Sequence, residues 1–376
     1  MAATQLEIDR NQMLLGGAER LPHVRAPRAF PPKPPASCQK SQMPATLQRS
    51  LTLPVQALAW LGGQGTRAIA ALVFIGIALP PLGELLKPYV TEAVFLLLCI
   101  SFMRVDLGAL RDHLRRPGVV LAATAWTTLA VPLMSGGICL LTGVHMRSPD
   151  LYLALMLQAV ASPMMASPAL AAVMGLDSTL VLVTLITSTA LIPITAPLFA
   201  YVFFGSALTL SPLGLGLKLV AILAGSMLVA TSVRWIAGVS AIRRHVRPID
   251  GLNVLFLLVF VAAVMGNVVG GFLADPVSTI ELTMLAFVVF FTLLGVTALI
   301  FRKAGNGRAM ALGLMVSQRN MGLMLAATDG VLPGTTWLYF ALSQFPIYLS
   351  PQLLKPMVRK LSAQPAASAA PEAGGA

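Results

Sequence analysis

Apolar runs separated by short polar loops fill the chain from residue 66 to residue 358. A helix needs about 20 apolar residues to cross a hydrocarbon core of about 30 Å. Ten segments meet or approach that length, and we predict a helix in each: 66–86, 90–104, 117–142, 150–175, 179–204, 212–237, 251–273, 276–301, 308–330 and 335–358. The pattern therefore predicts an all-α integral membrane protein with ten transmembrane helices. In the first pair, the segment PPLGELLKP leaves open a break inside a single unit.

Helix breakers and polar residues recur in the two halves of the chain at separations of 152–156 residues. The matched pairs are Pro163 and Arg319, Asp177 and Asp329, Pro193 and Pro346, and Pro197 and Pro351. Because each repeat has an odd number of helices, the second copy enters the membrane from the opposite side. The sequence thus predicts two inverted five-helix repeats, 66–204 and 212–358. In transporters built this way, the binding site lies near the midplane on discontinuous helices of both halves.

The two ends of the chain lack the apolar pattern. Residues 1–50 are rich in proline and basic residues, and residues 359–376 are low in complexity, so we expect both to be disordered tails. No apolar run of about 7–15 residues marks a secretory signal near the N-terminus. A translation start at Met43 instead of Met1 stays open.

Basic residues gather in alternate loops. One set of loops carries Arg104, Arg111, Arg115, Arg116, Arg234, Arg243, Arg244, Arg247, Arg302, Lys303 and Arg308. The opposite loops carry little besides Lys87 and Arg147. The positive-inside rule then places both termini in the cytosol, and we expect a multi-pass protein of the cell inner (plasma) membrane. The net charge of +12 lies in these loops and the tails, so no nucleic-acid partner is expected.

Composition argues against a soluble fold and against an enzyme. Apolar residues make up 57% of the chain, and charged residues make up 11%, compared with about 25% in soluble domains. The four histidines fall in tails or loops, and the three cysteines are scattered, so a membrane-embedded metal centre is not expected. There is no G-x-S-x-G motif. We therefore predict that the protein is not an enzyme.

Two segments concentrate polar residues and prolines at midplane depth. In 150–175, Ser162 and Ser167 flank a predicted helix break, and Met164 and Met165 lie between them. The alternative for this segment is a proline kink without function, with the hydroxyls bonded to local backbone. Such a break survives in lipid only where the freed backbone groups are buried or line a cavity.

The equivalent segment, 308–330, has Gln318, Arg319 and Asn320 at its centre. A central arginine costs about 2.5–3.5 kcal/mol to insert, so it indicates function by default. The alternatives are a structural anchor for Arg319 and helix–helix hydrogen bonding for its two neighbours. We assign all three to the substrate site.

Three further residues join the predicted substrate site. Thr184 and Ser188 share one helical face, although small residues at such positions also serve close packing. Gln344 lies beside Pro346 in the last helix and is assigned as a cavity residue.

Three stretches resemble the bile acid:sodium symporter family: FMRVDLGALRDHLRRP, SPMMASPALAAVMGLDSTLVLVTLITSTALIPITAPLFA and SQRNMGLMLA. The resemblance covers roughly residues 66–358. It implies ten helices in two inverted repeats, with the fourth and ninth broken and crossing. It also implies a core domain that moves against a panel of helices one, two, six and seven, with the substrate between them.

The chain departs from that family where sodium would bind. The family's sodium-coupled members have a glutamate where Met315 stands and a glutamine where Arg319 stands, whereas Asn320 is kept. Pro168 and Ala169 occupy places where the family offers serine and asparagine. At 4 Å, Arg319 and a sodium ion would repel by about 4 kcal/mol at an effective dielectric of 20.

These observations predict a secondary active or facilitative transporter of a small organic solute, an anion, that works by alternating access. Arg319 would replace the family's sodium ion as a built-in cation. The alternative is a sodium-coupled symporter of an organic anion, with backbone carbonyls, Gln318 and Asn320 as sodium ligands. Sodium is the one cofactor left open, and the solute and the lipid bilayer are the partners expected. Substrate identity, transport direction and oligomeric state stay open.

Overall fold

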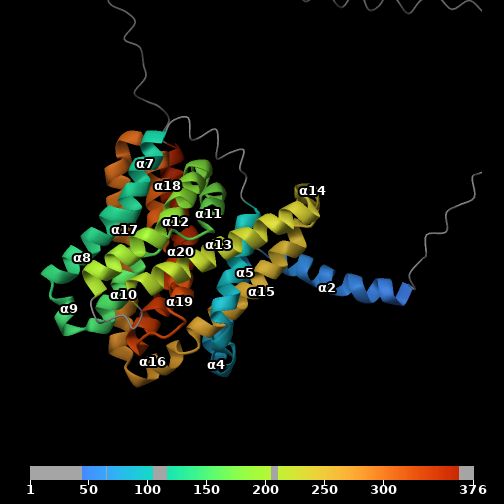
Figure 1. Cartoon of the computed structure of the whole chain (residues 1–376), viewed down its shortest axis with the longest axis horizontal. Coiled ribbons are helices and arrows are strands. Elements are labelled where there is room, and N and C mark those ends of the chain that lie inside the picture. Colours follow the sequence, from blue (N-terminus) through green and yellow to red (C-terminus); the bar gives the residue numbers. More distant parts are fainter. Residues whose placement is uncertain (1–44, 65, 105–116, 205–210, 364–376) are drawn as a thin grey trace, which may run out of the picture. The chain divides into compact units, whose positions relative to one another are not determined.

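The computed structural model describes residues 45–64, 66–104, 117–204 and 211–363, and within them every regular element is helical (Figure 1). The first part of the chain contains α2 Ala45–Gly63, α3 Thr66–Ala78, α4 Pro80–Leu86, η1 Lys87–Tyr89, α5 Val90–Met103, α7 Pro117–Ala125, η2 Trp126–Ala130, α8 Val131–Leu141, α9 Val144–Arg147, α10 Pro149–Val160, α11 Ser167–Val173, α12 Ser178–Phe199 and η3 Ala200–Phe204. The rest contains α13 Pro212–Ala237, α14 Val239–Arg244, α15 Val246–Met265, α16 Val268–Ala274, α17 Pro276–Ile300, η5 Phe301–Ala304, α18 Asn306–Ser317, α19 Met321–Ala327 and α20 Gly334–Ala363. The turns η1 and η5 are 3-10 helical, and η2 and η3 are π-helical.

Six helical stretches in the described residues are long and apolar enough to cross a membrane. They are Pro80–Met103, Pro117–Leu141, Ser178–Phe204, Pro212–Ala237, Val246–Ala274 and Pro276–Ala304. A shorter apolar helix, Pro149–Val160, precedes one of the helix breaks discussed below. Helical spans of this length satisfy their own backbone groups in lipid, which indicates a helical membrane protein.

The first two predicted helices have different boundaries from those expected. The sequence predicts helices at 66–86 and 90–104, but α3 ends at Ala78, and a single stretch of α4, η1 and α5 runs from Pro80 to Met103. Leu79 has φ −122° and ψ 66° and is followed by Pro80, which disfavours helix in the residue before it. Lys87–Tyr89 continues the stretch as a 3-10 turn that accommodates Pro88.

The ends of the chain also differ from the prediction where they are described. Helix α2 begins at Ala45, within the segment predicted as a disordered tail, and α20 continues to Ala363. The prediction for residues 1–44 and 364–376 concerns parts of the chain outside the described residues. Ala45–Gly63 contains the run QALAW, which is much shorter than a membrane span, so the apolar pattern does not predict this helix.

The spanning helices pack in two groups. In one group, α15 packs against α3, α4 and α5, and α13 packs against α5 (Figure 1). In the other, α17 packs against α18 and α20, α10 against α8 and α20, and α12 against α7 and α11. Helix α19 is shared, because it packs against α5 and α13 of the first group while following α18 of the second. Helix α13 also packs against α12 of the second group, so the interface between the groups passes along both α13 and α19.

Two glycines let α4 approach the end of α15 closely. A Cβ at Gly83 would lie 2.6 Å from the Cα of Gly266 and 2.7 Å from the carbonyl oxygen of Ala262, both backbone atoms. Backbone cannot move aside as a flexible side chain can, so the two helices must separate to accept any side chain there.

We expect Gly83→Val to destabilise the protein by about 1–3 kcal/mol, because it forces this overpacking. Thermal unfolding in detergent measures the effect as a fall in the unfolding midpoint. Gly270→Ala is the matched control, because a Cβ at Gly270 meets nothing within 4 Å. Equal midpoints for the two variants would contradict the close packing of α4.

Candidate functional site

Two helices are interrupted at the places where the sequence predicts breaks. Helix α10 ends at Val160 and α11 begins at Ser167, whereas α18 ends at Ser317 and α19 begins at Met321. Pro163 lies inside the first interruption and supplies no backbone donor, and its ring disfavours helix in the residue before it. The second interruption, residues 318–320, contains no proline, so its sequence signal is the polar triplet alone.

The two interrupted segments lie side by side and pair their backbones. Pro163 and Arg319 form an isolated antiparallel bridge. The amide of Met164 donates to the carbonyl of Gln318 at 2.8 Å, and the amide of Asn320 donates to the carbonyl of Ser162 at 2.8 Å. Each break thus satisfies backbone groups that the other has freed, which is how non-helical backbone is tolerated at membrane depth.

Arg319 is buried behind this bridge, with 1% of its surface exposed. Its Nη1 donates to the carbonyl of Ala161 at 2.9 Å and, at 3.5 Å, to the carbonyl of Thr127. Ala161 follows the last residue of α10, so its carbonyl belongs to the partially negative end of that half-helix. The guanidinium therefore offsets the charge of a helix terminus created by the break.

The carbonyl of Thr127, the second acceptor of Arg319, lacks a donor from its own helix because of a proline. In the π-helical turn η2, the amide of Val131 donates to the carbonyl of Trp126, five residues earlier. The same spacing would pair the carbonyl of Thr127 with the amide of residue 132, but Pro132 has no N–H. Arg319 is the donor that reaches this carbonyl instead.

The remaining donors of Arg319 are unsatisfied. Nε and Nη2 have no hydrogen-bond partner among the described residues. The ion pairs found in the same part of the chain join other side chains, namely Arg104 with Asp250, Lys218 with Asp329, and Arg308 with Asp177. Arg319 is therefore a buried guanidinium held by backbone carbonyls and not by a carboxylate.

The side chain of Gln318 bonds to two serine hydroxyls, and the side chain of Asn320 bonds to the backbone of the following helix. The Ser167 hydroxyl donates to Oε1 of Gln318 at 2.9 Å, and Nε2 of Gln318 donates to the Ser350 hydroxyl at 2.9 Å. The Oδ1 of Asn320 accepts from the amide of Leu323 at 3.1 Å and caps α19. These bonds fix the break in α18–α19 to α11 and α20.

A cavity of about 450 Å³ lies against the two breaks. Most of its wall is apolar, and the wall comes from both groups of helices. Its lining residues are Phe74, Val94, Leu97, Leu98, Ser101, Met164, Met165, Ala166, Leu170, Asn253, Leu257, Phe260, Arg319, Asn320, Met321, Gly322, Gln344, Phe345, Ile347, Tyr348, Leu349, Pro351 and Gln352. Pockets of this kind, apolar with a few polar groups, are the usual form of a small-molecule site.

The structure brings half of the predicted substrate residues to this cavity. Met164, Met165, Arg319, Asn320 and Gln344 line it. The other five, Ser162, Ser167, Gln318, Thr184 and Ser188, are buried but do not form its wall. Ser162 and Gln318 do not line this cavity: the carbonyl of Ser162 accepts from the amide of Asn320, and the side chain of Gln318 bonds to two serines.

Thr184 and Ser188 lie on the buried face of α12, and their hydroxyls have no partner among the described residues. Helix α12 packs against η2, which contains the acceptor Thr127, and against α10, which the acceptor Ala161 follows. The hydroxyl of Ser162 is likewise unpaired. Unpaired buried hydroxyls are uncommon, and an ion or a water molecule is one kind of partner that can satisfy them.

Sequence reasoning missed four polar residues of the cavity wall, Ser101, Asn253, Tyr348 and Gln352. Asn253 carried a signal, because it is one of two asparagines in the predicted helix 251–273, which is otherwise made of apolar residues and glycines. Ser101 lies near the end of α5, whereas Tyr348 and Gln352 lie inside α20, and no local pattern distinguishes these three, so only the tertiary arrangement identifies them.

Fold and site together define a class, a helical membrane protein with paired helix breaks beside an internal cavity. No family model matches the chain, and no curated protein is similar to it.

Proposed function

We propose that the protein is a secondary active or facilitative transporter that moves a small organic anion by alternating access. The observation that carries this proposal is a cavity of about 450 Å³ against two interrupted helices, with the buried cation Arg319 in its wall. A cavity bounded by two separately packed helix groups can open at either end when one group moves against the other.

Arg319 supports an anion as the transported solute. A guanidinium in a low-dielectric wall attracts a negative ligand in the adjacent cavity far more strongly than it would in water. It also takes the place of a bound cation, because its Nη1 holds the α10 terminus through Ala161. In this mechanism the positive charge of the site is covalently built in, so no coupling cation has to be recruited.

The finer architecture is part of the same proposal. The ten helices form two inverted five-helix repeats, with the breaks crossing in a core domain and α3, α5, α13 and α15 belonging to the panel. The protein belongs to the inner (plasma) membrane with both termini in the cytosol, is not an enzyme and needs no cofactor. The resemblance to the bile acid:sodium symporter family supports this arrangement.

Sodium-coupled symport of an organic anion is the second candidate. The unpaired hydroxyls of Ser162, Thr184 and Ser188 favour it, because hydroxyl oxygens suit a hard cation. The ligands first considered are less suitable, since the amides of Gln318 and Asn320 are engaged with Ser167, Ser350 and the backbone. A charge of the same sign at Arg319 opposes sodium in this region.

The test of the proposal starts with a thermal-shift screen of the purified protein against organic anions. The compounds that stabilise it are then offered as radiolabelled solutes to proteoliposomes. Saturable uptake above that of protein-free liposomes is the expected result. Stabilising anions that never enter the liposomes under an imposed solute or ion gradient would contradict transport.

Substitution of Pro132 tests the hydrogen bond between Arg319 and the carbonyl of Thr127. Pro132→Ala restores a backbone donor that can pair with the carbonyl of Thr127, so that Arg319 loses one acceptor. We expect uptake to fall by a few-fold while thermal stability stays equal or rises, because a helix-interior proline has been removed. Unchanged uptake with raised stability would show that the Thr127 contact has no role in transport.

A further inference from the structure

The cavity extends from the helix breaks toward one end of the helix bundle. Along α5 it is lined by residues from Val94 to Ser101, and along α15 by Asn253, Leu257 and Phe260, so it reaches toward the end of α5 and the start of α15. The same end of the bundle holds the ion pair between Arg104 and Asp250, whose atoms are 2.5 Å apart. This is the end that the positive-inside rule assigns to the cytosol.

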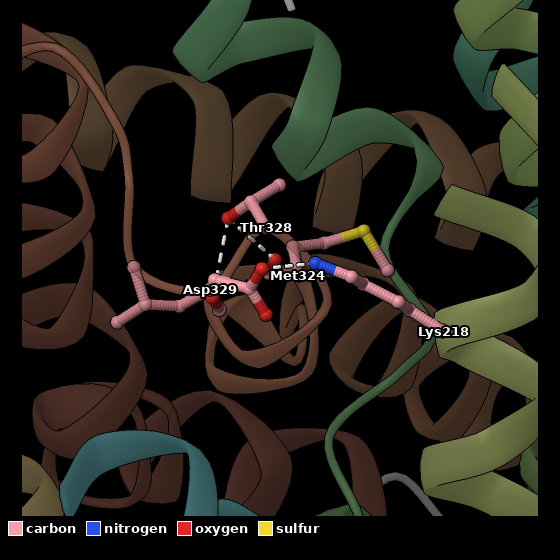
Figure 2. Close-up of polar contacts among 5 residues, drawn as sticks. Lys218, Met324, Thr328 and Asp329 are labelled. Carbon is pink, nitrogen blue, oxygen red and sulfur yellow. Dashed lines mark hydrogen bonds and ion pairs between the residues drawn. The ribbon is translucent and has the colours of Figure 1, made fainter. Parts of the chain in front are cut away.

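At the opposite end, α13 begins and α19 ends, and one ion pair joins them. Lys218, near the start of α13, pairs with the carboxylate of Asp329, two residues beyond the end of α19 (Figure 2). The two helices also pack against each other. The pair therefore connects a helix of the α5–α15 group to the half-helix that follows the break at Arg319.

The turn after α19 is shaped to present this carboxylate. The Thr328 hydroxyl donates to the carbonyls of Met324 and Leu325 (Figure 2). The amide of Gly330 donates to the carbonyl of Leu325 at 2.9 Å. Asp329 itself adopts φ 53°, a left-handed conformation uncommon for a residue other than glycine. Backbone strain of this kind is retained where the surroundings enforce it, and it occurs often at switch regions.

The equivalent aspartate of the first half makes a different contact. Asp177 lies 152 residues before Asp329 and pairs with Arg308 of α18 at 3.4 Å. Asp177 also caps α12 through the amide of Leu180 at 3.0 Å. Helices α11, α12 and α18 belong to the same packing group, so the Asp177–Arg308 pair does not connect the two groups. The asymmetry places the link between the groups at the Asp329 end.

We propose that the Lys218–Asp329 pair is the latch that keeps the far end of the cavity closed, and that it breaks when the cavity opens to that side. The proposal rests on the alternating-access function and adds the control of one of its two gates. Exposed ion pairs contribute at most about 1 kcal/mol, equivalent to a shift of about fivefold in an equilibrium. An ion pair of that strength favours the state in which the far end of the cavity is closed, but it still allows that end to open.

Accessibility from the far side tests the latch. The assay uses the full chain with Cys38, Cys99 and Cys139 replaced by alanine and a single cysteine introduced by Met165→Cys in the cavity wall. A membrane-impermeant maleimide is added to the side of the Asp329 end, and the labelling rate is measured in proteoliposomes. Asp329→Asn is the informative variant, because asparagine tolerates the left-handed conformation while lacking the charge.

We expect Lys218→Gln and Asp329→Asn each to raise the labelling rate by up to about fivefold. The double variant should match the single ones, because the second substitution has no interaction left to remove. Arg308→Gln is the matched control and should leave the rate unchanged. Rates equal to the parent in both single variants, or additive increases in the double variant, would overturn the latch.

Labelling requires no transported solute, so this assay and the uptake assay fail independently. If uptake fails but the two single variants raise labelling non-additively, the latch stands and the transport proposal does not. If uptake succeeds and labelling is unchanged, the protein transports by a gate other than Lys218–Asp329.

Discussion

Arg319→Gln lowers uptake of the selected anion by about 10- to 100-fold while leaving the midpoint of thermal unfolding unchanged or higher. The loss follows from the bond between Nη1 and the carbonyl of Ala161, because a hydrogen bond to a charged donor contributes about 1.5–3 kcal/mol. The stability result follows from Nε and Nη2, which are buried without partners. A buried charge that is incompletely hydrogen-bonded carries a desolvation cost, and replacing Arg319 by a neutral side chain relieves that cost.

Arg319→Lys is the matched variant, because it keeps the charge but loses the planar fork that reaches two carbonyls. It should retain more uptake than Arg319→Gln. Uptake and unfolding are measured on the same preparations. A large fall in stability for Arg319→Gln, together with normal uptake per folded molecule, would make Arg319 a structural anchor and remove it from the transport site.

Gly322→Leu lowers uptake by at least about tenfold. Gly322 lines the cavity at the start of α19, and a Cβ there would lie 3.0 Å from the ring of Phe260 and 3.2 Å from Val94. A leucine narrows the cavity and pushes α19 away from α5 and α15. Overpacking of this kind destabilises a protein by about 1–3 kcal/mol. Uptake in proteoliposomes, normalised to folded protein by size-exclusion chromatography, measures the effect.

Gly295→Leu is the control for this substitution. Gly295 lies on an exposed face of the spanning helix α17, and a Cβ there meets nothing within 4 Å. It should transport normally, because the added side chain faces lipid. If both leucine variants transport at the parent rate, the cavity beside Gly322 is not the path of the solute.

Several features of the site could be predicted from the sequence for local reasons. Proline imposes its break on its own segment, so Pro163 located the end of α10. A polar triplet in the middle of an apolar run is unfavourable in an unbroken helix, and residues 318–320 form the second break. The separation between matched features led to the expectation that these segments meet, and the bridge between Pro163 and Arg319 joins them.

Other features depend on distant contacts that no local pattern contains. The contact of Arg319 with Thr127 joins residues 192 positions apart and requires both a π-helical turn and Pro132. Ser162 and Gln318 were expected at the cavity because a break exposes them, but the carbonyl of Ser162 bonds to the amide of Asn320, and the side chain of Gln318 bonds to two serines. The end of α3 was misplaced because PPLGELLKP contains several breakers, and only packing decides which of them ends a helix.

The most direct test of the built-in cation is uptake of the selected anion with sodium or with potassium as the only alkali cation, in proteoliposomes of the parent protein and of Arg319→Gln. The account predicts equal initial rates in the two salts for the parent protein, because Arg319 already supplies the positive charge of the site. A saturable requirement for sodium in the parent protein, with Arg319→Gln transporting at the same rate, would contradict it.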